Sequence, residues 1–378
     1  MPNAALRPAL ARLAPLDWMR GLVMILMSVD HASGAFNAGR IFSDSARMAT
    51  PGMELPAAQF LTRWLTHLCA PTFVFLAGAA VALSAERRKQ RGEPGRSIDR
   101  YLLTRGLLIA ALDPLWMTWG LTWGRIWLLQ VLYAIGTSLM LMTWLRRLPT
   151  TWLVGISLSL MVGMEAIIAA TATLGTGPHT TLLIGFILSG LQRGPLVVGY
   201  PTLPWLAIMM LGWAYGRSYV VARPKVPERF LFAAGVCTLA LFVMVRGANR
   251  YGNMGLFREG SSLVQWLHVS KYPPSLSYIA LELGLMAIIL SGFFALDRLQ
   301  GDFPGQKLLL VLGQTALFYY VLHVHLLEAA AHLLHLESRL GLSSAYLGGA
   351  LIVILLYPAC LRYRSYKQAH PGGWTRYL

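Results

Sequence analysis

The protein has 378 residues, of which 56% are hydrophobic and only 13% are charged. A soluble domain carries about 25% charged residues, so this chain has too little polar surface to face water on all sides. The formal net charge is +16. In a membrane protein such an excess collects in cytoplasmic loops, and the basic residues form no stripe interleaved with aromatics that would indicate nucleic-acid binding. We therefore expect an integral membrane protein that has the lipid bilayer as a partner and binds no nucleic acid.

Apolar segments of roughly membrane-spanning length recur along the whole chain. The pattern predicts an all-α fold, a polytopic transmembrane bundle of about ten helices, in a single integral-membrane domain over 1–378. We place the helices at 16–34, 65–85, 102–119, 126–145, 152–173, 202–221, 229–246, 273–296, 307–334 and 343–362. The apolar stretch 181–191 is too short to span a bilayer. The long ninth helix is expected to break near Gly313.

Lys and Arg are unevenly divided between the two sides of this bundle. With the N-terminus inside, 20 of the 32 lie on the cytoplasmic side and 10 on the opposite side, and the densest cluster falls at 87–100. This bias predicts that both termini are cytoplasmic. We interpret the first apolar segment as a retained helix, because Asp30-His31 interrupts it and no small-residue cleavage site follows.

The first predicted helix carries four ionisable residues, Asp17, Arg20, Asp30 and His31. Arg20 and His31 are eleven positions apart, about 20° from three full turns, so they share one face roughly 16 Å apart, while Asp30 points about 100° away. Ionisable groups inside a span are costly and commonly mark a functional site. Because histidine exchanges protons near neutral pH, His31 is the candidate general base. Spacing alone leaves open that Asp17 and Arg20 are interfacial anchors and His31 a boundary residue.

The second predicted helix places another histidine at the depth of His31. His67 lies near its outer end, and Pro71 removes a helix hydrogen bond and can kink the helix there. Consecutive antiparallel helices could therefore bring the two histidines together at the outer face. His67 is the second candidate base, although an interfacial histidine without a catalytic role fits the same position.

Other polar residues in or near the spans have two interpretations each. Three residues are spaced three and four apart, and we interpret them as a polar helix face near the outer boundary in preference to a metal site: His325, Glu328 and His332. Three single acids either form a proton path or pair with bundle neighbours: Asp113, Glu165 and Glu282. The three cysteines are scattered along the chain and predict neither a disulfide nor a thiolate metal site: Cys69, Cys237 and Cys360.

Short motifs occur in a fixed order along the chain. They are Asp17-x-x-Arg20-Gly21, Arg20-x10-His31, Ala70-Pro71-Thr72-Phe73-Val74-Phe75-Leu76-Ala77-Gly78, Tyr200-Pro201-Thr202-Leu203-Pro204-Trp205, Lys271-Tyr272-Pro273-Pro274-Ser275-Leu276 and Leu317-Phe318-Tyr319-Tyr320-Val321-Leu322-His323. Together they resemble the transmembrane acyltransferase superfamily, and in particular its bacterial branch related to the catalytic domain of heparan-α-glucosaminide N-acetyltransferase. The resemblance covers nearly the whole chain and implies a location in the bacterial cytoplasmic (inner) membrane.

The resemblance implies an acetyl-CoA-dependent O- or N-acetyltransferase. An acyl group would pass from cytoplasmic acyl-CoA, a co-substrate, to a hydroxyl or amine of a carbohydrate or other small acceptor outside, with no bound cofactor and no metal. Arg20 and His31 match the essential pair of the superfamily, so the catalytic candidates are His31, Arg20 and His67. The candidates for substrate binding are Asp17, Asp30, Lys271, Tyr272 and His323. Basic residues that could attract the CoA phosphates are Arg96, Arg100 and Arg105.

One departure from the lysosomal enzyme concerns its catalytic histidine, which lies in a His-x-x-Trp-Asn-Gly stretch before the second helix. The corresponding loop 35–64 here contains no histidine, so a heparan sugar is not implied as acceptor. The alternative function is a transporter or flippase for a small metabolite or lipid-linked sugar. That class predicts an inverted repeat with paired broken helices, and the sequence shows no such repeat.

Overall fold

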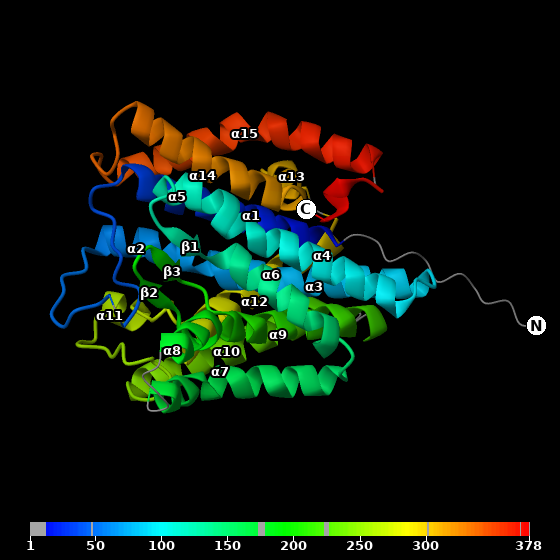
Figure 1. Ribbon diagram of the computed structural model, residues 1–378, viewed down its shortest axis with the longest axis horizontal. Helices are drawn as coiled ribbons and strands as arrows, with labels where there is room; N and C mark the ends of the chain where they lie inside the picture. Colours follow the sequence, from blue (N-terminus) through cyan, green and yellow to red (C-terminus); the bar gives the residue numbers. More distant parts are fainter. Residues whose placement is uncertain are drawn as a thin grey trace, which may run out of the picture.

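The computed structural model describes residues 13–46, 48–172, 178–222, 227–300, 302–370 and 372–377. Long helices run side by side along the length of the molecule, with short strands and loops at one end (Figure 1). In chain order the elements are α1 (Ala14–Phe36), α2 (Ala57–Leu65), η1 (Thr66–Leu68), α3 (Cys69–Gln90), α4 (Gly95–Leu112), η2 (Asp113–Met117), α5 (Thr118–Thr122), β1 (Trp127–Leu129), α6 (Val131–Leu145), α7 (Thr150–Ala172), α8 (Pro178–Ile184), η3 (Gly185–Ser189), β2 (Leu191–Arg193), β3 (Leu196–Val198), α9 (Thr202–Ala222), α10 (Pro227–Ala248), α11 (Leu263–Leu267), α12 (Leu276–Arg298), α13 (Gln306–Gln314), α14 (Ala316–Leu333), α15 (Ser343–Ala369) and η4 (Trp374–Tyr377).

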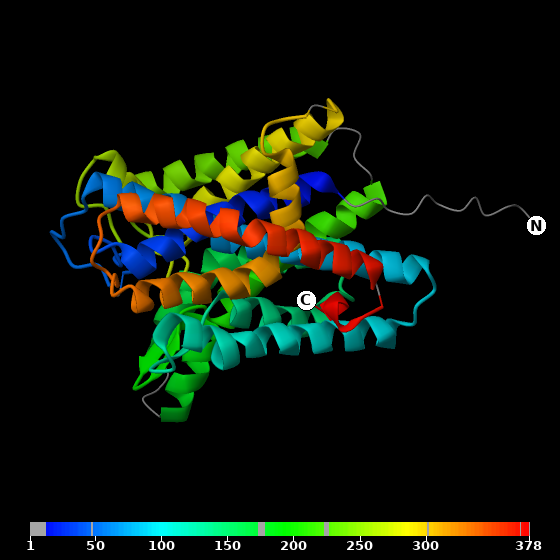
Figure 2. The same cartoon turned by 90° about the horizontal axis from the view of Figure 1, so that it is seen from above.

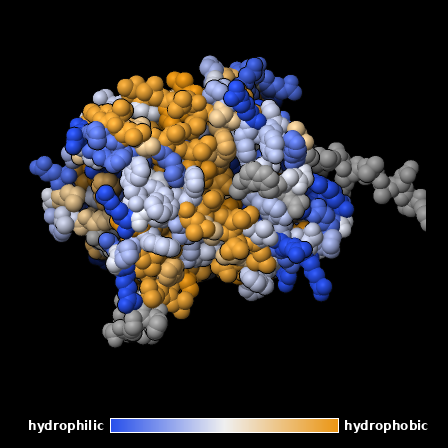
Figure 3. Space-filling model, turned by 45° about the horizontal axis from the view of Figure 1, so that its top comes forward, coloured by the Kyte–Doolittle hydropathy of each residue, from blue (hydrophilic) through white to orange (hydrophobic). Residues whose placement is uncertain are grey.

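Hydrophobic side chains form a band across the middle of the molecule, between hydrophilic side chains at its two ends (Figure 3). Within the described residues, six helical segments are long and apolar enough to cross a membrane: Ala57–Gln90, Thr150–Thr171, Pro227–Ala248, Leu276–Arg298, Ala316–Leu333 and Ser343–Ala369. This arrangement is that of an integral membrane protein, as the composition predicts.

A small sheet departs from the all-α expectation. Strands β1, β3 and β2 lie in that order, with β1 parallel and β2 antiparallel to β3. The predicted helix 126–145 is therefore wrong at its start, because α6 begins only at Val131. The buried Asp113 carboxylate accepts the backbone N–H groups of Gln130 and Tyr133, both at 2.7 Å, and so caps this helix from a neighbouring element.

The break predicted in the ninth helix is present, since α13 ends at Gln314 and α14 begins at Ala316. The separate short helix α13 packs very closely on α1. A Cβ added at Gly21 would overlap the backbone oxygen of Leu309, and one at Gly313 would overlap the backbone oxygen of Asp17. Small residues at such contacts let helix backbones approach inside a membrane, and here they fix the first turns of α1.

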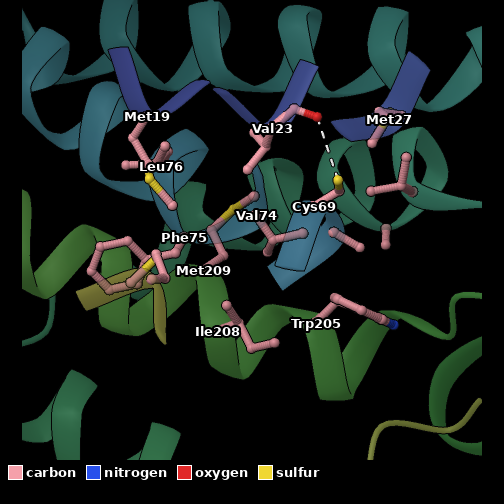
Figure 4. Packing of buried hydrophobic residues seen from close by; sticks show 14 of the residues in the cluster. Met19, Val23, Met27, Cys69, Val74, Phe75, Leu76, Trp205, Ile208 and Met209 are labelled. Atoms are coloured by element: carbon pink, nitrogen blue, oxygen red, sulfur yellow. Dashed lines mark hydrogen bonds between the residues drawn. The ribbon is translucent and has the colours of Figure 1, made fainter. Parts of the chain in front are cut away.

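A central part of the hydrophobic core lies between α1, α3 and α9. Met19, Val23 and Met27 of α1 face α3, while Ile208 and Met209 of α9 approach α3 from the other side (Figure 4). Close approach of α3 and α9 rests on further glycines, because a Cβ on Gly212 would overlap the backbone oxygen of Phe75. This packing makes α1, which carries the predicted site residues, a central helix of the bundle.

The two ends of the bundle differ in structure. At the first, which we call the basic end, Asp99 of α4 pairs with Arg146 at 2.6 Å, and Arg217 of α9 donates to the Leu148 backbone oxygen at 2.7 Å. At the opposite end, which we call the loop end, the segments 37–56 and 249–275 meet, and His268 Nε2 lies 2.7 Å from the backbone oxygen of Ser43. A second view shows the same division of turns and loops between the ends (Figure 2).

Candidate active site

Two cavities lie along α1 and abut each other. The basic-end cavity, of about 330 Å³, is lined by Arg20 and extends toward Lys367. The loop-end cavity, of about 510 Å³, is lined by His31 and lies under the loops. Met27, Val131 and Tyr320 line both cavities, so the two spaces meet at these three side chains. The two cavities are therefore neighbours that share these three side chains as part of their walls.

His31 forms a hydrogen-bonded pair with a second histidine. Its Nδ1 lies 2.8 Å from Nε2 of His323, and the rings stack with centroids 4.9 Å apart. His323 Nδ1 lies 3.0 Å from the backbone oxygen of Tyr319, which only accepts, so Nδ1 of neutral His323 carries the proton and its Nε2 is an acceptor. His31 Nδ1–H therefore donates to His323, which leaves a lone pair on His31 Nε2. No residue that the structure describes hydrogen-bonds this nitrogen.

Asp30, the residue before His31, lies in a cluster of charged side chains. We call this cluster the arginine clamp and define it as Asp30, Arg40, Asp44 and Arg63. Arg63 reaches both oxygens of Asp30 at 2.7 and 2.9 Å and Asp44 at 2.6 Å. Arg40 lies 3.1 Å from the Asp30 carboxylate, and Thr66 Oγ1 donates to it at 3.0 Å. The clamp joins α1, α2 and the loop after α1, and so fixes the helix turn that carries His31.

His67 lies behind the clamp and is 1% exposed. Its Nε2 lies 3.1 Å from Asp44, and because a carboxylate only accepts, this nitrogen donates. Burial opposes ionisation of Asp44, but the Arg63 guanidinium and the His67 hydrogen bond outweigh it and hold the pKa of Asp44 well below its usual range. Among the residues described, His67 lines neither of the two cavities. The structure thus pairs His31 with His323 and does not bring His67 to it.

Two further predicted residues line the loop-end cavity. Lys271 is 4% exposed, its backbone N–H donates to the Asp44 backbone oxygen at 2.9 Å, and its ammonium lies 5.3 Å from the Tyr272 ring centroid. The Tyr272 hydroxyl lies 3.3 Å from that of Tyr200. These side chains add a cation and two hydroxyls to the lining of the cavity.

Cations gather at the basic-end cavity. Arg20 pairs with Asp17 at 2.8 Å and donates to a backbone oxygen of α3 at 3.0 Å, while Gln314 donates to Asp17 at 3.3 Å. Arg105 and Lys367 line the same space. Asp17 and Arg20 thus form an i,i+3 pair on α1, which holds Arg20 at the cavity wall.

Comparison with known families decides between the possible classes. The family model "Heparan-alpha-glucosaminide N-acetyltransferase, catalytic" matches residues 12–245, more than half of the chain. The chain belongs to this family. No match was found among curated proteins. Family membership and the apolar helices together identify a membrane transferase of the acetyltransferase class. Arg20, His31 and His67 lie inside the matched region, whereas Lys271 and His323 lie beyond it.

The remaining predicted polar residues serve other contacts in this acetyltransferase-family domain. The three polar residues that share a face of α14 make different contacts. His325 bonds to backbone oxygens at 2.8 and 3.1 Å, Glu328 lines the loop-end cavity, and His332 pairs with Glu337 at 2.7 Å. Glu165 accepts a backbone N–H from the loop after α10 at 2.5 Å. These contacts connect helices to loops at the loop end.

Sequence reasoning missed four residues of the site: Arg40, Asp44, Arg63 and Tyr320. Arg40 and Arg63 were counted only as loop charges and Asp44 was not considered, although a carboxylate such as Asp30 within a span needs a buried cation nearby, and Arg63 lies just before the second predicted helix. Tyr320 belongs to one of the family-like motifs, but a motif gives no position relative to a cavity.

Proposed function

We propose that the protein is a membrane-embedded acyltransferase that moves an acetyl group from acetyl-CoA to a hydroxyl or amine of a sugar-like acceptor. The donor occupies the basic-end cavity and the acceptor the loop-end cavity. One observation carries the proposal: the two cavities meet beside His31, whose Nε2 lone pair is uncommitted. A base at the boundary of two spaces suits transfer between substrates that arrive from opposite ends.

His31 is the proposed base, with His323 as its positioning partner. His31 Nε2 takes the proton of the acceptor as the acceptor oxygen or nitrogen attacks the thioester carbonyl carbon. The imidazolium then returns the proton to the departing CoA sulfur. In a two-step route the same nitrogen attacks the thioester carbon, and the carbon–sulfur bond breaks to release CoA thiolate. The acceptor later takes the acetyl group from the imidazole and gives up its proton, so the intermediate would leave label on the protein. His67 has no direct role in this scheme, since it lines neither of the two cavities.

Cations support a donor site at the basic end. Arg20, Arg105 and Lys367 line this cavity, and phosphates of CoA are favoured next to guanidinium and ammonium groups. Lys271 and Tyr272 in turn offer hydrogen bonds to an acceptor in the loop-end cavity. We infer from this polarity that the basic end is cytoplasmic, as the loop charges predict.

The proposed topology has about ten spans, with both termini in the cytoplasm and the loop end outside, in a bacterial inner membrane. Labelling of single cysteines in intact cells tests it. Arg91→Cys in the turn after α3 is expected to resist a membrane-impermeant thiol reagent, and Ser261→Cys in the loop before α11 is expected to react. The opposite pattern would reverse the orientation.

The function is tested with purified protein and radiolabelled acetyl-CoA. Wild type and His332→Ala, which changes an exposed histidine outside both cavities, are expected to release CoA thiol, and folded His31→Ala is not. Label on wild-type protein alone would indicate the two-step route. Failure of wild type to bind or consume acetyl-CoA or longer acyl-CoAs would contradict the proposal and favour the transport alternative.

A further inference from the structure

We infer that the hydroxyl of Tyr320 donates a hydrogen bond to the oxyanion of the tetrahedral intermediate during acyl transfer. This inference rests on the proposed function and adds the group that the reaction still needs. A thioester carbonyl under attack develops negative charge on oxygen, and a fixed donor at that point is commonly the largest single contribution to catalysis. The mechanism above supplies a base but no such donor.

The position of Tyr320 carries the inference. Of the three residues that line both cavities, Met27 and Val131 are apolar, and Tyr320 alone has a hydrogen-bond donor. A carbonyl that passes from donor to acceptor must stand at this junction when the new bond forms. The Tyr320 ring lies 6.0 Å from the His31 ring and 5.7 Å from the His323 ring, measured between centroids, and Tyr320 and His31 both line the loop-end cavity.

The Tyr320 hydroxyl is also uncommitted. The residue is 5% exposed, and none of the residues that the structure describes hydrogen-bonds its side-chain oxygen. The other two tyrosines of the loop-end cavity, Tyr200 and Tyr272, lie 3.3 Å apart and bond each other. The hydroxyl is therefore available to donate to a ligand oxygen in the space that Tyr320 lines.

The bond changes balance with the residues present. The acceptor oxygen or nitrogen attacks the thioester carbon, and its proton moves to His31 Nε2. The carbonyl π electrons move to oxygen, where Tyr320 O–H donates without transferring its proton. When the carbonyl re-forms, the carbon–sulfur bond breaks, and the sulfur takes the proton from His31. The products are acetylated acceptor and CoA thiol, and both side chains return to their starting states.

Steady-state turnover of acetyl-CoA, with water as acceptor and CoA thiol as the measured product, tests the inference. Tyr320→Phe is expected to lower kcat by about 10²–10³-fold with KM for acetyl-CoA within about twofold, because the donor acts only on the intermediate. The control is Tyr215→Phe, which removes a buried hydroxyl that has no hydrogen-bond partner in the described part of the chain and lines neither cavity; its kcat is expected within twofold of wild type.

A second substitution separates hydrogen bonding from shape. Tyr320→Gln keeps an N–H donor, so its kcat is expected between those of wild type and Tyr320→Phe at an unchanged melting temperature. A Tyr320→Phe enzyme with kcat within threefold of wild type, or with only KM raised, would overturn the inference while leaving the proposed function standing. If wild type itself does not turn over acetyl-CoA, the proposed function fails and this inference with it.

Discussion

Removal of the central cation of the arginine clamp is expected to destabilise the loop end strongly. Arg63→Met deletes hydrogen bonds of 2.7 and 2.9 Å to Asp30 and of 2.6 Å to Asp44. The Arg63 side chain is 9% exposed and that of Asp44 is 6% exposed. Breaking a buried pair by removing one partner costs about 3–5 kcal/mol, because the other charge remains uncompensated. Arg40 still reaches Asp30, so most of the loss falls on Asp44.

The free energy of unfolding in mixed detergent micelles measures this effect. The matched control is Arg147→Met, which breaks a 2.9 Å pair with Asp99 in which the arginine side chain is 60% exposed. An exposed pair of this kind contributes about 0–1 kcal/mol. Arg63→Met combined with Asp44→Asn removes the orphaned charge and is expected to recover about 1–3 kcal/mol relative to additivity. Equal losses from Arg63→Met and Arg147→Met would refute the reasoning.

Three further changes have defined outcomes. His323→Leu is expected to lower kcat for acetyl-CoA turnover about 10–100-fold, because His31 Nδ1–H loses its acceptor; a kcat within twofold would contradict this. Gly212→Ala is expected to cost about 1–3 kcal/mol of unfolding free energy by overpacking, whereas Gly155→Ala, with open space around its Cβ, should cost nothing. Because the folded-state pKa of Asp44 lies below its unfolded value near 3.9, its ionised form stabilises the fold fully above about pH 4, and this contribution is lost as pH falls through the folded-state pKa. The stability difference between wild type and Asp44→Asn should therefore shrink in acid; a constant difference would count against it.

Long apolar segments made most of the helices predictable from sequence. The break in the ninth helix was also confirmed, although the start of the fourth predicted helix was not, because a sheet strand occupies Trp127–Leu129. That strand pairs with β3, about seventy residues later in the chain, so no local pattern announces it. Helix periodicity is local information, whereas strand pairing depends on which distant segments the bundle brings together.

For the candidate site, too, local geometry could be predicted from the sequence, whereas contacts between distant segments could not. The shared face of Arg20 and His31 follows from helix geometry, and the structure places both on cavity walls. The partner of His31 could not be predicted, because 292 positions separate it from His323 in the sequence. Equal predicted depth made His67 a plausible neighbour, but depth fixes only the position along the membrane normal. Which helices adjoin is decided by small residues such as those between α1 and α13.

The extent of the catalytic unit follows from these contacts. The family model covers residues 12–245 and ends within α10, yet Tyr320 and His323, on which the proposed chemistry depends, lie in α14. Gln314 holds Asp17, and α13 packs backbone to backbone on α1, so the later helices also fix the donor side. Neither cavity is closed by the matched region alone. These contacts favour the interpretation that 1–378 acts as a single integral-membrane domain, in which α14 supplies the positioning partner of the base and the proposed oxyanion donor.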